Sequence, residues 1–457
     1  MTIKNFLIIA VVGCFSLALT TAKGQNFQYT NKLEEVSFSD AKSSQLIIIS
    51  SDDGREFYLA PQWKPTSSLP VAYVSGSYLN VGGKFRFACK PRANEVWVQG
   101  KCSNGFKLPP QKLHFDSRDP TLGIYDAASS DAKFADNKVD YYKDFKIDWY
   151  VSDNSSGNNS MLIGSSVNDL YITFTASIYS IYYHTLIHLG CTNAVGLTNQ
   201  DDIVKGIYEE FRDLKVRKVN GTEDLGYWRG ANPLNTPACR STVGFLAYQD
   251  AACSEWATFL KDILGMQGIY SNIVVIFWSL PNSDNTYPLT DRSKTMLKED
   301  ARNQLSLTDP VYTENLNNIA TLQPSQYQVS NAYFFVKNWL VGRDRSFGNC
   351  DYYSNNYNAC LDDLIGLPGQ GNQDPRAFFE NHAIVGYKKL DGSYVYYDPS
   401  YGTGAFANEE AWENASVDGF GAIIHSKPAR SLNISKKTWN QEANILTTTL
   451  VTFVIIP

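Results

Sequence analysis

Three side chains in the second half of the chain, those of Cys253, His382 and Asp398, together have the chemistry of a nucleophilic centre. A cysteine attacks an amide carbon as its thiolate, a histidine takes up and returns the proton, and a carboxylate orients the imidazole. Taken alone, Cys253 is better explained as a small core residue than as a nucleophile, because free cysteines are often buried and inert. The histidine and the aspartate downstream favour a nucleophile, and the reaction would be acyl transfer.

The stretch around the cysteine, Tyr248 to Ile269, is predicted to be a helix. Asp250 can act as its N-cap, and Gly265 and Gly268 are stop signals. Cys253 then lies in the first turn, where the partial positive charge of the unpaired N–H groups favours thiolate over thiol. Apolar residues follow it with the 3.6-residue period of one helix face, at Trp256, Ala257, Leu260, Ile263 and Leu264.

The histidine and the aspartate belong to a predicted β-hairpin, Asn381 to Tyr401. Leu390-Asp391-Gly392 suits a three-residue loop with glycine in the left-handed conformation. This loop would pair Ile384 with Asp398 and leave His382 on the same face, within reach of the carboxylate as a diagonal neighbour. A two-residue Asp-Gly loop would place the two side chains on opposite faces. His425, also downstream of Cys253, lacks such a partner strand.

These stretches resemble the transglutaminase-like superfamily, whose members have a papain-like cysteine protease core. The resemblance rests on CSEWA from Cys253, on the LGMQGI helix ending, on His382-Ala383 and on Asp398-Pro399-Ser400. It implies an α+β fold with a transglutaminase-like catalytic domain and a Cys253, His382 and Asp398 triad. Because the spacing from cysteine to histidine is longer than in the family core, an insertion at about 279 to 380 is expected.

An oxyanion formed at the site would need hydrogen-bond donors, and the backbone N–H of Cys253 at the helix start is one candidate. The resemblance implies a further side-chain donor upstream, for which Gln249, Tyr248 and Trp228 are candidates. It favours a secreted peptidase or amidase acting on a protein or peptide substrate, with no cofactor. The alternatives are a protein-crosslinking transglutaminase and a non-catalytic binding or scaffold protein that retains the fold.

Residues 1–24 have the features of a signal peptide: Lys4, then an apolar run from Phe6 to Leu19, then small residues up to Gly24. They predict a protein that is extracellular, periplasmic or on the cell surface. A lipid anchor at Cys14 is the less favoured alternative, because apolar residues follow this cysteine. The run is too short for a lasting membrane span. A net charge of −6 without a basic stripe argues against a nucleic-acid partner.

Residues 25–175 are predicted to be all β. Phe145, Ile147, Trp149 and Val151 alternate with more polar residues, as in a half-buried strand. Turn residues at short intervals suit an immunoglobulin-like β-sandwich with Trp149 in its core. Helices follow, the first marked by apolar residues from Ile178 to Leu189, so that the catalytic domain would span 176–430. A C-terminal strand segment, 431–457, would complete the chain.

Of the eight cysteines, seven remain after Cys14 is set aside, and an odd number in an exported chain suggests disulfides plus one free thiol. Proximity along the chain suggests three pairs and leaves Cys253 free, although sequence alone permits other pairings. The suggested pairs are Cys89 with Cys102, Cys191 with Cys239, and Cys350 with Cys360. His184 and His188 have metal-ligand spacing, but no glutamate follows His184 as in zinc proteases, so we predict no metal site.

Overall fold

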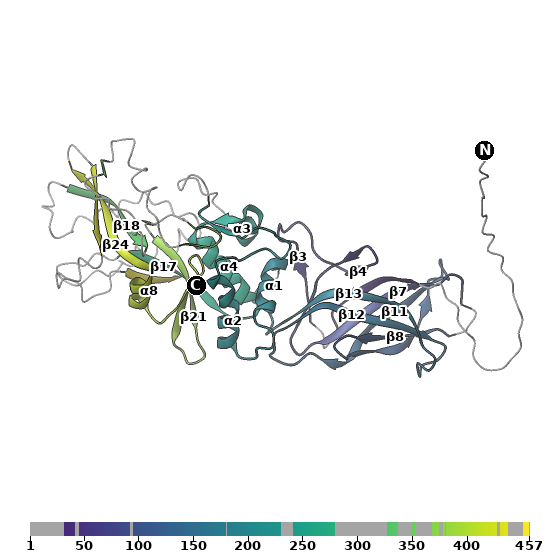
Figure 1. The fold of residues 1–457 in the computed structure, drawn as a ribbon. Helices are drawn as coiled ribbons and strands as arrows, with labels where there is room; N and C mark the ends of the chain where they lie inside the picture. The colour runs from purple at the N-terminus through teal and green to yellow at the C-terminus, as the bar shows by residue number, and fades with distance from the viewer. Residues whose placement is uncertain are drawn as a thin grey trace, which may run out of the picture.

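The computed structural model describes residues 32–41, 45–91, 95–179, 181–229, 241–278, 327–336, 350–351, 368–373, 378–379, 381–426, 430–436 and 451–456. The signal peptide predicted at 1–24, with Cys14, lies outside these residues. The fold is mixed α+β, with many strands and few helices. The molecule is elongated, with a β-sandwich at one end, helices in the middle and further sheets at the other end (Figure 1). Among the described residues, no helix has the length and apolar character of a membrane span.

The sandwich consists of two six-stranded sheets. The first has the order β10 (His114–Phe115), β11 (Leu122–Lys133), β7 (Tyr78–Arg86), β1 (Lys32–Phe38), β4 (Trp63–Lys64) and β5 (Ser67–Ser68). The second has the order β2 (Leu46–Ile47), β6 (Val71–Val74), β13 (Met161–Thr173), β12 (Asp140–Ser152), β8 (Trp97–Cys102) and β9 (Lys107–Lys112). All neighbouring strands are antiparallel except β6 and β13.

One apolar core lies between the two sheets, because buried residues of both belong to the same cluster. Trp149 on β12 is fully buried and packs against Phe85 and Tyr125, with ring centroids 5.4 and 5.3 Å apart. The alternation predicted for this strand, with Phe145, Ile147, Trp149 and Val151 inward, is confirmed.

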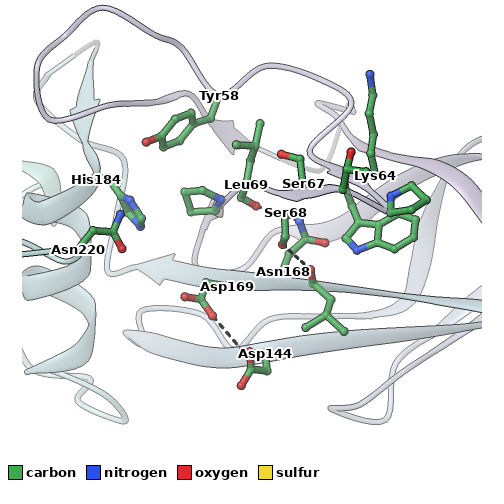
Figure 2. Close-up of a pocket in the computed structure, with 15 residues that line it drawn as sticks. Tyr58, Lys64, Ser67, Ser68, Leu69, Asp144, Asn168, Asp169, His184 and Asn220 are labelled. Carbon is green, nitrogen blue, oxygen red and sulfur yellow. Dashed lines mark hydrogen bonds between the residues drawn. The ribbon is translucent and has the colours of Figure 1, made fainter.

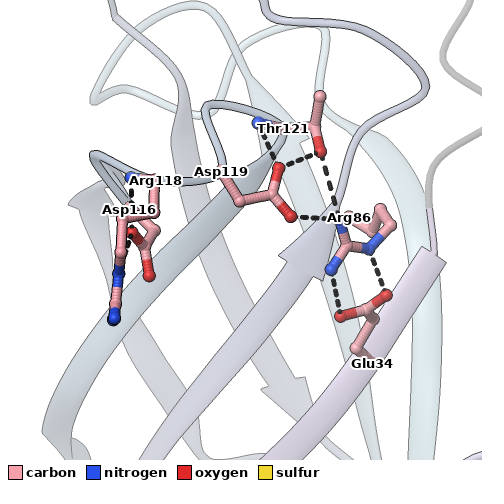
Figure 3. Close-up of polar contacts among 6 residues, drawn as sticks. All are labelled: Glu34, Arg86, Asp116, Arg118, Asp119 and Thr121. Atoms are coloured by element: carbon pink, nitrogen blue, oxygen red, sulfur yellow. Dashed lines mark hydrogen bonds and ion pairs between the residues drawn. The ribbon is translucent and has the colours of Figure 1, made fainter.

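A polar cluster lies at one end of β7 and β1, two interior strands of the first sheet. The Arg86 guanidinium on β7 binds Glu34 on β1 and Asp119 in the turn before β11 (Figure 3). Its Nη1 also donates to Thr121 Oγ1 at 3.1 Å. Hydrogen bonds lower the pKa of Asp119 to about 2, the one from the Thr121 side chain contributing most and the one from Arg86 next. Every charge in this cluster has a partner inside it, so the cluster is structural.

Four helices form the middle layer: α1 (His184–Thr192), α2 (Gln200–Arg212), α3 (Thr242–Tyr248) and α4 (Cys253–Met266). Their core continues into the sandwich, because Ile49, Ala72 and Tyr171 belong to the same buried cluster as the helices. The helix predicted from Ile178 begins only at His184. The residues before it form β14 (Tyr182–Tyr183), which pairs with β3 (Ile49–Ser50), and this tertiary pairing overrides the local helical period.

The sheet beside the helices has the order β23 (Thr403–Phe406), β22 (Tyr394–Asp398), β21 (Asn381–Lys388), β17 (Ser271–Trp278) and β26 (Val451–Ile456). A second five-stranded sheet has the order β19 (Cys350–Asp351), β25 (Arg430–Lys436), β24 (Val417–Ser426), β18 (Tyr327–Val336) and β20 (Phe378–Phe379). The described residues of the range 279–380, where an insertion is predicted, form β18, β19 and β20. The remaining short elements are β15 (Gly226–Tyr227), β16 (Asp250–Ala251) and α8 (Glu409–Ser416).

The cysteines differ from the expected pairing. Cys89, Cys102, Cys191 and Cys253 are all free thiols. Cys102 is buried in the sandwich core while Cys89 is exposed, so the proposed pair does not form. Cys191 is buried between α1 and the sandwich, where it receives a hydrogen bond from Gln267, and it is not bonded to Cys239. Cys239 and Cys360 lie outside the described residues, and only the backbone of Cys350 is described.

Candidate active site

Helix α4 places Cys253 at its first residue. The predicted apolar face is confirmed, because Trp256, Ala257, Leu260, Ile263 and Leu264 are all buried. The helix packs against β21 and β17, and Trp256 Nε1 donates to Gly226 O at 3.1 Å. Asp250 is not the N-cap. That position is Ala252, while the Asp250 carboxylate accepts a hydrogen bond from the Arg229 N–H, because Asp250 belongs to the short strand β16.

The hairpin of β21 and β22 has the register predicted from its loop. Val385 pairs with Tyr397, so the next pair along is Ile384 with Asp398. Gly392 adopts a φ of 88° and closes the three-residue loop through a hydrogen bond to Lys389 O. His382 is therefore on the same face as Asp398, two residues from the directly opposed position.

His382 and Asp398 form a buried pair with no solvent exposure. The imidazole Nε2 lies 2.8 Å from Asp398 Oδ2. Burial alone lowers the pKa of the imidazole, but the charges of Asp398 and Cys253, and hydrogen bonds with both, raise it to about 10. The Cys253 sulfur is thus close enough to interact with the ring directly. Since Nε2 is engaged by the carboxylate, Nδ1 is the ring nitrogen available to the sulfur.

Two residues that the sequence did not single out hold Asp398. Trp412, fully buried on α8, donates from its indole Nε1 to Asp398 Oδ2 at 3.3 Å. The same indole lies nearly parallel to the His382 ring, with centroids 5.9 Å apart. Tyr208 on α2 donates from its hydroxyl to the backbone O of Asp398 at 2.9 Å. Both the carboxylate and its backbone are therefore fixed.

Aromatic side chains close the site on its other sides. The Tyr401 ring lies 5.6 Å from that of His382 and 5.2 Å from that of Tyr227. Tyr227 is buried, and burial raises the pKa of its phenol, with further contributions from Tyr401 and Cys253. This phenol therefore stays protonated.

The three oxyanion candidates have different surroundings. Trp228 follows β15, and its N–H donates to Ala251 O, two residues before Cys253. Its side chain is half-buried against the core cluster that also contacts Cys253. Gln249 ends α3 in the left-handed conformation, and its backbone O accepts from Gly226 N. Tyr248 is 67% exposed at the last residue of α3, so the helix predicted from Tyr248 to Ile269 is wrong at its start, because α4 begins only at Cys253.

Gln370, in the glycine-rich segment before the histidine, connects both sides of the site. Its side-chain Nε2 donates to Phe211 O at the end of α2 and to Pro399 O beside Asp398, at 2.6 and 2.9 Å. Its backbone N donates to Ser400 O, and its backbone O accepts from Tyr227 N. Fully buried, Gln370 joins the carboxylate loop to the segment that leads to Trp228.

The two histidines with metal-ligand spacing are separate from this site. The Tyr171 hydroxyl lies 3.3 Å from His184 Nε2 and 3.0 Å from His188 Nδ1, so one phenol satisfies both rings. Burial lowers the pKa of His184 to about 4. In the part of the chain that the structure describes, no group of three or more histidine, cysteine or acidic residues is arranged to hold a metal ion.

Comparisons with known proteins do not assign a family to this chain. No family model matches the sequence, and no curated protein matches it. The site is therefore interpreted from its own geometry: a cysteine at a helix start and a buried imidazole hydrogen-bonded to a buried carboxylate.

Proposed function

We propose that this protein is an exported transglutaminase-like cysteine enzyme that cleaves amide bonds, as a peptidase or amidase. The observation that carries the proposal is the buried, hydrogen-bonded pair of His382 and Asp398, with Cys253 at the start of α4 near enough for its charge to affect the pKa of the imidazole. A histidine with a raised pKa beside a thiol favours an imidazolium and a thiolate over two neutral groups. The thiolate is the nucleophilic form of cysteine.

In the proposed reaction the Cys253 sulfur attacks the amide carbon and forms a carbon–sulfur bond, while the carbonyl electrons move to oxygen. Cys253 is the first residue of α4, so its backbone N–H has no acceptor inside the helix and can donate a hydrogen bond to this oxyanion. Among the three side-chain candidates we favour Trp228, because it is held beside Ala251. His382 then gives its proton to the leaving amine, and the carbon–nitrogen bond breaks.

The resulting thioester would be hydrolysed by water, with His382 taking the proton of the water. Asp398 holds the imidazole through Nε2 and compensates its charge. The predicted signal peptide supports export, and the two-sheet sandwich around Trp149 supports an immunoglobulin-like companion domain.

The test is to incubate the protein with a peptide library, with and without an added primary amine, and to analyse the products by mass spectrometry. Cleavage that is abolished in Cys253→Ala supports the peptidase proposal. Amine adducts in place of cleavage would identify a cross-linking transglutaminase. If neither product forms while Cys253 still reacts with iodoacetamide, the site binds substrates of another class. If Cys253 is inert as well, the proposal is wrong.

A further inference from the structure

A second candidate site lies where the sandwich meets the helices, in a cleft of about 560 Å³. Figure 2 shows Lys64, Ser67 and Ser68 of the β4–β5 hairpin on one side and His184 and Asn220 on the other. Small-molecule sites have volumes in this range. None of the residues proposed for catalysis lines this cleft.

A buried amide at the wall of this cleft supplies an acceptor that no described residue satisfies. Asn168 on β13 is only 1% exposed, and its Nδ2 donates to Gln62 O at 3.1 Å and to Leu69 O at 2.9 Å. These two bonds fix the orientation of the amide, so Oδ1 is an acceptor held in place. Oδ1 has no hydrogen-bond partner among the described residues. Because a buried acceptor without a donor is costly, a ligand that donates to it would be favoured.

Further hydrogen-bonding groups surround this amide. Asp169 follows Asn168 directly, and its Oδ1 accepts a hydrogen bond from the Asp144 N–H at 3.1 Å. This bond fixes the backbone of Asp144, whose carboxylate is the second one that lines the cleft. Two further groups that can donate line the cleft from different sides, the hydroxyl of Ser67 on the β4–β5 hairpin and the amide of Asn220 next to His184 (Figure 2). The lining therefore offers both acceptors and donors.

The charge of the cleft excludes an anionic ligand. Two carboxylates line it, while its one lysine, Lys64, lies 3.8 Å from Glu35, a partner outside the cleft. His184 is uncharged near neutral pH, because burial lowers its pKa to about 4. A phosphate or nucleotide would be repelled by this set of charges.

Aromatic and apolar groups form the rest of the wall. The Tyr58 ring packs edge-on against His184, with centroids 5.8 Å apart, and the half-buried Trp63 lies in β4. A ligand that suits this wall has apolar faces as well as groups that both donate and accept. Sugar rings combine the two, since each hydroxyl donates and accepts while the ring carbons pack on aromatic surfaces. A simple amine would use only the acceptors.

We propose that this cleft binds a short uncharged saccharide, with hydroxyl groups donating to Asn168 Oδ1 and Asp169 and accepting from Asn220. The site is independent of Cys253 and would hold the protein on a glycan or a glycosylated partner.

The test is calorimetric titration of the full-length protein with chitotriose, cellotriose and maltotriose. Two variants address the cleft: Asp169→Asn removes a charged acceptor, and Ser67→Trp fills the cleft from an exposed strand position. Asp153→Asn, an exposed carboxylate of the sandwich away from the cleft, is the matched control. At least one trisaccharide should bind, and each cleft variant should weaken it about ten-fold or more, since charge-assisted hydrogen bonds are the stronger ones.

The control and Cys253→Ala should bind as the wild type does, which separates this proposal from the proposed enzyme activity. Failure of all three sugars to bind would overturn the proposal. Equal binding by both cleft variants would also overturn it, because the sugar would then lie elsewhere. Binding of spermidine, a polyamine probe, with no binding of sugars would show a cation site and reject the saccharide class.

Discussion

Replacing Asp398 with asparagine should remove the negative charge that favours the protonated form of His382. In the folded protein the pKa of His382 lies at about 10 against an ordinary value of 6.5. That difference corresponds to about 5 kcal/mol in favour of the protonated ring. Among the interactions that raise the pKa, the charge of Asp398 is the largest, and burial opposes it. Asp398→Asn should therefore lower the pKa of His382 and leave a neutral imidazole beside Cys253.

The rate at which iodoacetamide alkylates Cys253 reports this change without any knowledge of the substrate. At pH 6 an ordinary cysteine is ionised in roughly 1 molecule in 300, whereas a cysteine paired with an imidazolium is largely thiolate. Alkylation of Cys253 at pH 6 should thus slow on the order of 100-fold in Asp398→Asn. Peptide mass mapping over a pH series separates Cys253 from the other cysteines.

Asp262→Asn is the control, because this half-buried carboxylate also accepts a hydrogen bond, from Thr242, but lies on α4 away from His382. Its alkylation profile should follow the wild type. A wild-type profile that rises with pH like that of a free cysteine would refute the imidazolium–thiolate pair. An unchanged rate in Asp398→Asn would refute the role assigned to the carboxylate.

The remaining predictions concern the same residues and the buried thiols. Gln370→Met keeps the length of the side chain but removes the donor to two carbonyl groups, of which Phe211 O keeps a backbone donor and Pro399 O has no other donor among the described residues. The free energy of unfolding in a urea titration should therefore fall by about 2–4 kcal/mol, and alkylation at pH 6 should slow. Wild-type stability or wild-type alkylation would contradict this assignment. Trp412→Phe keeps an aromatic ring beside His382 but removes the donor to Asp398, and stability should fall by about 1.5–3 kcal/mol, measured in the same titration. No loss would mean that the indole bond is dispensable. Burial raises the pKa of both Cys102 and Cys191 to about 12, so native protein treated at pH 8 should leave both unmodified in mass mapping, and alkylation of either would contradict this burial.

The same shift of His382 has a consequence for stability. A group whose pKa is raised on folding adds its full stabilisation below its unfolded pKa, here 6.5, and loses it as the pH rises toward the folded value. The free energy of unfolding should therefore decline between pH 6.5 and about 10, measured by urea titration at each pH. The decline should be smaller in Asp398→Asn, and an equal slope in both proteins would contradict the pairing.

Local chemistry made part of the site predictable. The loop of β21 and β22 contains a glycine that adopts a left-handed φ, and loop length alone then sets which residues of the two strands face each other. The apolar period after Cys253 likewise defined α4. In both cases the decisive interactions are close along the chain, so a single sequence contains the necessary information.

Tertiary contacts account for what the sequence did not indicate. Tyr182 has helical spacing with its neighbours, but it pairs with Ile49 in β3, a residue far away in the chain. Gln370 and Trp412 act through hydrogen bonds to groups on distant segments, and neither belongs to a motif. Backbone carbonyl groups as acceptors are invisible in a sequence, because every residue has one.

Because several other cysteines are free thiols, being a free thiol is no longer a reason to single out Cys253. The expected pairing of the other cysteines would have left Cys253 as the one free thiol, but Cys89, Cys102 and Cys191 are free as well. What distinguishes Cys253 is its environment. Cys102 and Cys191 are buried where desolvation disfavours the thiolate, whereas Cys253 is half-buried at a helix start beside a positively charged imidazole. The reactivity proposed for Cys253 therefore rests on its position in the fold, and a count of disulfides would not have identified it.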